Sequence, residues 1–143
     1  MLKLKEDIRI FSDESRLVEL LHIQARQVID FSAQYDVYDR TSGIMVGSLR
    51  RGGLRSMARD TWQALDPSGT PFGILQEDSL KLALLRRVLA GGLVPQNFDL
   101  MIGSERVADL RQRFNLFRYE LELDFRMDPN RRLDRRLGLA AGI

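Results

Sequence analysis

One hairpin pattern occurs twice in this sequence, and this repeat constrains the fold more than any other feature. Each copy has an apolar or aromatic strand, an aspartate, a Ser-Gly turn, and a second strand with a glycine four residues past the turn glycine; the copies are YDVYDRTSGIMVGSLRR (35–51) and TWQALDPSGTPFGILQE (61–77). Aspartate can bond to the backbone of its own turn and glycine accepts a positive φ, so we expect Asp39 and Asp66 to be turn residues. The repeat therefore predicts an antiparallel β-meander.

Further strands are predicted on both sides of the repeat. RYELELDFRMD (118–128) alternates apolar and charged residues over its whole length, which is typical of a strand with one buried face. A third hairpin is predicted with strands 98–102 and 106–113 and with Gly103-Ser104 in its turn. Segment 13–29 stays open, because SDESRLVELL fits a short capped helix while LLHIQARQVIDF fits a strand.

Two helices are predicted. The first covers about 79–90, where Asp78 or Ser79 would cap LKLALLRRVLA and Gly91-Gly92 would end it. The second lies in the last ten residues, DRRLGLAAGI, with Asp134 as its cap. Because this terminal segment is apolar on nearly every side, we expect it to be buried inside the molecule.

Composition narrows the protein class. A chain of 143 residues with 44% hydrophobic and 29% charged residues is typical of one soluble globular domain. The chain contains no cysteine, which excludes disulfides, thiolate metal sites and cysteine nucleophiles. Its N-terminal residues do not resemble a signal peptide, and no apolar run has the ~20 residues of a membrane span. We expect a cytoplasmic protein, at most peripheral at the inner membrane face.

Four separated motifs in this order resemble bacterial relatives of the LURP-one-related family, which belongs with the tubby C-terminal domain and the phospholipid scramblases. The motifs are YDVYDRTSG, RDTWQALDPSG, QEDSLKLALLRR and LDRRLGLAA, and the likeness covers roughly residues 8–143. It implies an all-β fold with minor α content: a tubby-like closed antiparallel β-barrel around a C-terminal hydrophobic helix, with one peripheral helix near 79–90. We expect residues 1–143 to form this single domain.

The chain departs from the family at its end. The family's central helix continues well past LGLAA, whereas this chain ends at Ile143. We therefore expect a central helix cut short at the C-terminus, either because the chain is truncated or because a short helix fills the barrel. A truncated helix would leave the barrel interior poorly filled, at a cost in stability.

Signals for an enzyme are weak. His22, the only histidine, lies among apolar residues and is interpreted as structural or as a surface residue. Neither a nucleophile-elbow motif nor a phosphate loop nor a Cys/His metal spacing occurs. We expect no catalytic residues, no cofactor and no metal.

Arginine clusters are the best candidates for a binding site. The stretch from Arg40 to Arg59 contains five arginines and no acid, and 81–87 contains three bases and no acid. Arginine suits bidentate contacts to phosphate or carboxylate, although genome composition explains its abundance equally well. The anion-binding candidates are Arg50, Arg51, Arg55, Arg59, Arg86 and Arg87. The alternative is a solvated rim with salt bridges to Glu77, Asp78 or Asp60. The arginines of 131–136 would guard the barrel mouth or hold phosphate.

These observations predict a non-enzymatic module that binds anionic lipid headgroups or phosphorylated ligands through an Arg-rich rim. The resemblance adds that the tubby domain binds phosphoinositide headgroups through basic side chains, so an anionic membrane surface or a phosphoinositide-like ligand is the expected partner. The alternative is a structural or protein-interaction barrel, with a protein partner or self-association. Scramblase-like activity is a weaker option, and nucleic acid is not expected because no aromatic stacking platform is evident.

Overall fold

The computed structural model describes residues 6–26, 33–52, 61–77, 97–113 and 120–143. These residues form one nine-stranded antiparallel sheet and one short helix, so the all-β prediction is confirmed. The elements are β1 (Asp7–Phe11), β2 (Glu19–Ala25), β3 (Gln34–Asp39), β4 (Met45–Arg51), β5 (Thr61–Leu65), β6 (Pro71–Glu77), β7 (Asn97–Ile102), β8 (Glu105–Arg113), β9 (Glu120–Asp124) and α2 (Arg135–Ala140). Each strand pairs with the next in the chain, which is the predicted meander.

All three predicted hairpins are present, as β3–β4, β5–β6 and β7–β8. The two repeat aspartates are turn residues as predicted. Asp39 Oδ1 accepts the Thr41 amide at 2.8 Å, and Asp66 Oδ1 accepts the amides of Ser68 and Thr70, both at 2.9 Å. Local carboxylate-to-amide bonds of this kind stabilise the chain reversal without any tertiary contact.

Each of the three hairpins also contains a β-bulge on its second strand. The register shifts leave Val46, Phe72 and Val107 as the extra residues. The later glycine of each repeat copy follows its bulge directly, as Gly47 and Gly73. A Cβ on Gly47 would lie 2.5 Å from the Leu65 carbonyl oxygen, and one on Gly73 would lie 3.1 Å from the Met101 carbonyl oxygen. The repeated glycine is therefore explained by close approach of a neighbouring backbone at a bulge.

The open question about segment 13–29 is decided in favour of a strand in its described part. Residues 19–25 form β2, which pairs with β1, and residues 12–18 form the connecting turn. The Ser15 amide donates to Asp13 Oδ1 at 2.8 Å and the Ser12 amide to the Val18 carbonyl at 2.9 Å. The alternative of a short capped helix is wrong, because these bonds close a hairpin turn.

The last strand is shorter than predicted. β9 ends at Asp124, so the prediction of a strand through Asp128 is wrong for its last four residues. The Asp124 carboxylate accepts both the backbone amide of Arg126 at 2.9 Å and its guanidinium at 2.6 Å, and these local bonds turn the chain away from β8. Residues 118 and 119 lie outside the described residues, as does the predicted helix near 79–90.

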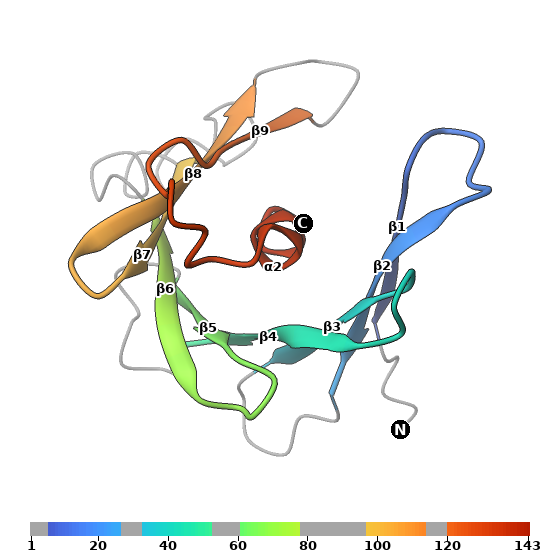
Figure 1. Cartoon of the computed structure of the whole chain (residues 1–143), viewed down its shortest axis with the longest axis horizontal. Coiled ribbons are helices and arrows are strands. Elements are labelled where there is room, and N and C mark those ends of the chain that lie inside the picture. The colour runs from blue at the N-terminus through green and yellow to red at the C-terminus, as the bar shows by residue number, and fades with distance from the viewer. Residues whose placement is uncertain (1–5, 27–32, 53–60, 78–96, 114–119) are drawn as a thin grey trace, which may run out of the picture.

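The C-terminal helix α2 is present, with Asp134 as its N-cap, as predicted. The Asp134 side chain accepts the Arg136 amide at 2.9 Å. The sheet curls, and α2 lies on its concave side (Figure 1). Leu137 and Ala140 of the helix are buried with residues of β2 to β5, and Leu133 before it is buried with residues of β6 to β8. The terminal segment therefore joins the two halves of the core.

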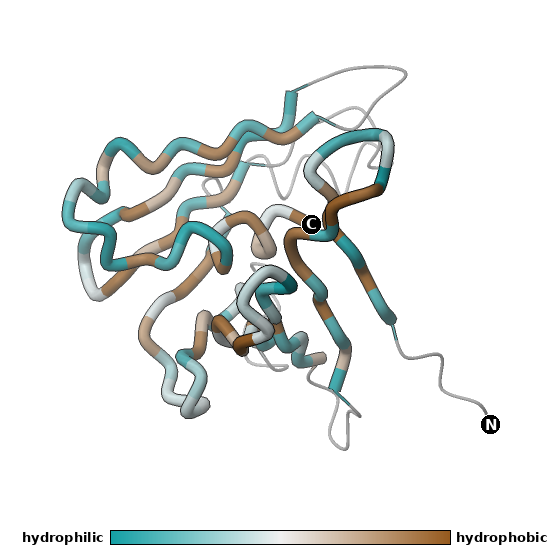
Figure 2. The backbone as a smooth tube through the Cα atoms, turned by 45° about the vertical axis from the view of Figure 1, so that its right-hand side comes forward, coloured by the Kyte–Doolittle hydropathy of each residue, from teal (hydrophilic) through white to brown (hydrophobic). Residues whose placement is uncertain are grey.

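The described strands do not close into a barrel. Pairing runs from β1 to β9 without a return, and no pairing among the described strands joins the two edges. The edge strands β1 and β9 lie well apart in Figure 1. Apolar and polar residues alternate along the strands, as Figure 2 shows, so one face of each strand is turned to the core. The structure shows an open, curved sheet, and the closed barrel stays a prediction.

Candidate functional site

The antiparallel order places the ends of β2, β4, β6 and β8 at one end of the sheet, together with the starts of the odd-numbered strands. We call this the long-connection end, because its four connections have 6 to 19 residues, whereas the four at the opposite end have 2 to 7. The described arginines at its strand ends are Arg26 after β2, Arg50 and Arg51 in β4, and Arg113 in β8. Three of the four even-numbered strands thus end in, or are directly followed by, an arginine.

The predicted Arg-rich rim is only partly within the described residues. Arg55, Arg59, Arg86 and Arg87 lie outside them. Arg50 and Arg51 are the last two residues of β4, so their side chains leave opposite faces of the sheet. The structure therefore places these two candidates at one end of the sheet but does not point them at one ligand.

Arg50 is half-buried and bonded within the sheet. Its Nη2 donates to Gln63 Oε1 at 2.7 Å and its Nε to the same oxygen at 3.2 Å, across the β4–β5 pair. Arg51 is exposed and pairs in register with Trp62. It leaves the same face of β4 as Leu49, which faces the concave side. Of the two, Arg51 is the one placed to meet a ligand at the concave face.

A carboxylate network that the sequence analysis missed lies beside these residues. Asp36 is buried and accepts Ser48 Oγ at 2.8 Å and Arg26 Nε at 2.5 Å. Tyr35 and Leu49, next to them in sequence, line the concave side, so Asp36 and Ser48 both point to the opposite face of the sheet. This alternation was the sequence signal that could have placed them together. The network fixes Arg26 at the end of β2 and leaves its other guanidinium nitrogens to donate elsewhere.

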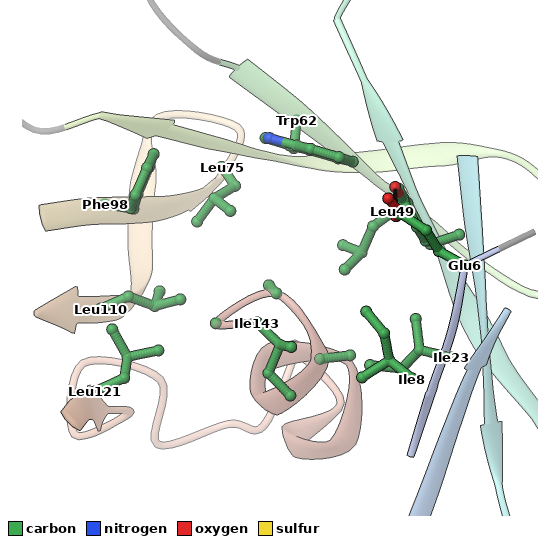
Figure 3. A pocket seen from close by; sticks show the side chains of 14 residues that line it. Glu6, Ile8, Ile23, Leu49, Trp62, Leu75, Phe98, Leu110, Leu121 and Ile143 are labelled. Carbon is green, nitrogen blue, oxygen red and sulfur yellow. Dashed lines mark hydrogen bonds between the residues drawn. The ribbon is translucent and has the colours of Figure 1, made fainter. Parts of the chain in front are cut away.

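A cavity of about 300 Å³ lies between the concave face of the sheet and the C-terminal residues (Figure 3). Its described side chains are apolar apart from Glu6 and the polar atoms of Tyr35 and Trp62. The lining residues are Glu6, Ile8, Ile23, Tyr35, Leu49, Trp62, Leu75, Phe98, Leu110, Leu121, Ala140, Ala141, Gly142 and Ile143. Ile143, one of its lining residues, is 63% exposed, so the cavity is open to solvent and a molecule can enter it.

The sequence carried a signal for this cavity that was not recognised. All five odd-numbered strands begin with a polar residue followed by a large apolar one, and the second residue lines the cavity in each case. These second residues are Ile8 in β1, Tyr35 in β3, Trp62 in β5, Phe98 in β7 and Leu121 in β9. The pattern recurs at the long-connection end, where the cavity lies.

One polar pair lines the cavity. The Tyr35 hydroxyl donates to the Glu6 carboxylate, and this hydrogen bond, with burial, raises the pKa of Tyr35 to about 12. The Tyr35 ring also packs against Trp62, with ring centroids 5.8 Å apart. Since the phenol already donates to Glu6, it offers no free donor to a molecule in the cavity.

At the opposite end of the sheet, the arginines of 131–136 hold the C-terminal segment. Arg136 donates to Asp39 of the first repeat turn at 2.6 Å and to Asp134 at 2.6 Å. Arg132 pairs with Glu105 at 2.6 Å, and Arg135 with Asp128 at 3.3 Å. These three side chains are 34–39% exposed and each is also engaged with a carboxylate, so the prediction that they guard a barrel mouth stays a prediction.

The Asp39–Arg136 pair gives a pH prediction. The Arg136 guanidinium, followed by the Thr41 amide, lowers the pKa of Asp39 from 3.8 to about 2. The pair therefore stabilises the folded state fully above about pH 4, and this contribution is lost as the pH falls toward 2. In urea titrations, Asp39→Asn should be less stable than wild type at pH 6, and the difference should vanish near pH 2. A difference that is constant with pH would contradict this assignment.

His22 contacts an aspartate of the neighbouring strand. Its Nε2 lies 2.8 Å from Asp7 Oδ1, where the two side chains meet across the β1–β2 pair. In the part of the chain that the structure describes, no group of three metal-ligating side chains is found. Nor does any helix within the described ranges have the length and hydropathy to cross a bilayer.

Comparison with protein-family models, with curated proteins and with solved structures finds no match to this chain. The resemblance to the LURP-one-related family therefore stays a prediction that rests on its motifs.

Proposed function

We propose that this protein is a non-enzymatic module that binds phosphate-bearing headgroups of an anionic membrane surface at the long-connection end of its sheet. The observation that supports this most is the recurrence of arginine at that end, as Arg26, Arg51 and Arg113. The tubby-like barrel and the peripheral location at a membrane belong to the same proposal. Their support is the four motifs and a meander that curves around α2.

Exposure favours all three arginines, and spare guanidinium donors favour Arg26 and Arg113. The Arg26 and Arg113 side chains are 53% and 66% exposed, and Arg51 is exposed as well. Arg26 uses Nε for Asp36, and Arg113 uses Nε and Nη2 for Glu122, so each keeps guanidinium donors for a phosphate oxygen. Partial pairing with carboxylates holds the side chains in place and reduces the local positive charge.

Acidic residues at the same end limit the affinity. Glu6, Glu120 and Glu122 are exposed there, so the field of the arginines is partly cancelled. We therefore expect binding that depends on the surface density of anionic lipid and that weakens with salt, because exposed charges are screened over about 10 Å at 0.1 M salt.

The test is vesicle flotation of a charge-reversal variant. The variant carries Arg26→Glu, Arg51→Glu and Arg113→Glu, and vesicles contain phosphatidylcholine alone, phosphatidylserine or phosphoinositide, at low and high salt. With each basic residue contributing about 1 kcal/mol near an anionic surface, affinity should fall by roughly 100-fold. Soluble inositol phosphate as a competitor distinguishes a headgroup site from attraction to the surface as a whole.

A matched control carries the same change in charge elsewhere. Arg16→Glu, Arg106→Glu and Arg126→Glu alter exposed arginines outside the long-connection end. The control should keep its binding. Equal losses in both triple variants would show that net charge alone attracts the membrane, and no loss in either would show that these arginines do not bind it.

A further inference from the structure

We propose that the cavity beside α2 binds an uncharged hydrocarbon group, with an aliphatic chain of roughly ten carbon atoms as the matching size. An apolar cavity of about 150 Å³ binds benzene, and this one has about 300 Å³. This site goes beyond the proposed headgroup contact, since it selects by apolar surface and volume and needs no anion.

The lining determines the ligand class. Side chains from both halves of the sheet and from the C-terminal residues point into the space, with Ile143 near its middle in Figure 3. Among the described lining residues, Glu6 is the only one with a charged side chain, and its carboxylate accepts the Tyr35 hydroxyl. Water in such a space would find few hydrogen-bond partners, whereas a hydrocarbon would gain dispersion contacts with Leu49, Leu110 and Leu121.

The charge of the lining argues against a ligand that would bury a carboxylate or a phosphate in the cavity. No described basic side chain lines the cavity, and Glu6, the one charged side chain in its described lining, would repel an anion. Burying an uncompensated charge is costly, so a charged group of the ligand must stay outside. Arg51 leaves the same face of β4 as Leu49, at its end, so a lipid with its chain in the cavity could place its headgroup there. A free apolar molecule would need only the cavity.

Trp62 provides a direct readout, because it is the only tryptophan in the chain and it lines the cavity. A bromine atom quenches tryptophan fluorescence on contact. We expect 11-bromoundecanol to quench Trp62 in a saturable way, with competition by 1-decanol. Decanoate should compete at least tenfold less well, since it would bring a carboxylate to Glu6.

Two variants that fill the cavity test the site, and a third variant with the same kind of change outside the cavity serves as the control. Ala141→Phe and Leu121→Phe enlarge lining residues on different elements, so that one remains informative where the other fails to fold. Both should weaken bromoundecanol binding at least tenfold. Ile74→Phe, on the exposed side of β6, should leave it unchanged.

Two results would overturn the site: no saturable quenching in wild-type protein, or quenching that persists unchanged in both filled variants. Vesicles of brominated phosphatidylcholine identify the source of the chain. Quenching by these vesicles that Ala141→Phe abolishes assigns a lipid chain, and quenching by the free alcohol alone assigns a small apolar ligand. The Arg26/Arg51/Arg113 variant should still bind the alcohol, which separates this site from the headgroup contact.

Discussion

Replacing Asp128 with alanine is expected to lower the free energy of unfolding by about 3 kcal/mol, because a buried carboxylate with charged and amide partners is lost. The Asp128 side chain is fully buried. Its oxygens accept the backbone amides of Arg132 and Leu133, both at 3.0 Å, and Arg135 Nη1 at 3.3 Å. Burial raises the pKa of this carboxyl, but the amides and the two arginines outweigh it, so the net pKa is lowered.

The reason for a large effect is the set of partners that would be left behind. Without the carboxylate, the amides of Arg132 and Leu133 lose their acceptor in a segment where Leu133 is wholly buried. Arg135, which also stacks on the Phe125 ring at 4.5 Å, would lose its counter-charge. The turn at 128–133 positions the start of α2, so the helix should detach from the core.

Asp124→Ala is the matched control, measured like Asp128→Ala by urea unfolding at pH 7. Asp124 also pairs with an arginine, but Arg126 is 90% exposed and the contact is local. Its replacement should cost much less than that of Asp128. Equal losses in the two variants would contradict the assignment of Asp128 as the buried anchor of the terminal segment.

Replacing Gly47 with alanine should have an effect of similar size, about 3 kcal/mol, through overpacking and backbone strain. A Cβ there would lie 2.5 Å from the Leu65 carbonyl oxygen and 3.2 Å from Leu137 Cδ2. The oxygen belongs to the strand that neighbours β4, so it cannot move without disturbing the β4–β5 pairing. Leu137 lies on α2, so the same change also pushes the helix from the sheet.

Gly69→Ala separates the clash from the general cost of replacing glycine. Gly69 has φ +87° and nothing within 4 Å of the added Cβ, so only the backbone conformation opposes alanine there. That cost is about 1 kcal/mol. Thermal unfolding of both variants should show the larger loss for Gly47→Ala, and the reverse order would refute the explanation of the repeated glycine.

Local chemistry explains why the hairpins could be predicted. The Asp39 and Asp66 turns form through bonds to amides within four residues, and alternation along 98–113 needs only the pleat of a strand. Alternation also caused one error in the predicted strand 118–128. The apolar–polar pattern continues to residue 128, but the strand ends at Asp124, whose carboxylate accepts the Arg126 amide. Periodicity describes which face a side chain would take and does not say where pairing stops.

The candidate site was predictable only in part, for a spatial reason. Arg50 and Arg51 are adjacent in sequence, yet the pleat of the strand points their side chains to opposite faces. In addition, the Arg50 guanidinium donates a hydrogen bond to Gln63 Oε1. The cavity combines residues from all nine strands and from the last four residues of the chain, so no local window contains it. Its one sequence signal is a polar residue followed by a large apolar one at the start of a strand. This signal predicts a cavity only when the strand order is known, because the order places these starts at the same end of the sheet.

The sequence by itself determined the antiparallel meander, its turn residues and the capped terminal helix, since each depends on interactions within a few residues. The tertiary structure alone decided how these parts combine. It decided that the described strands form an open sheet, that Asp128 and Asp39 hold the C-terminal segment through arginines, and that a cavity lies beside α2. Those outcomes depend on which side chains meet across strands far apart in the chain, and such meetings are set by packing and pairing rather than by local preference.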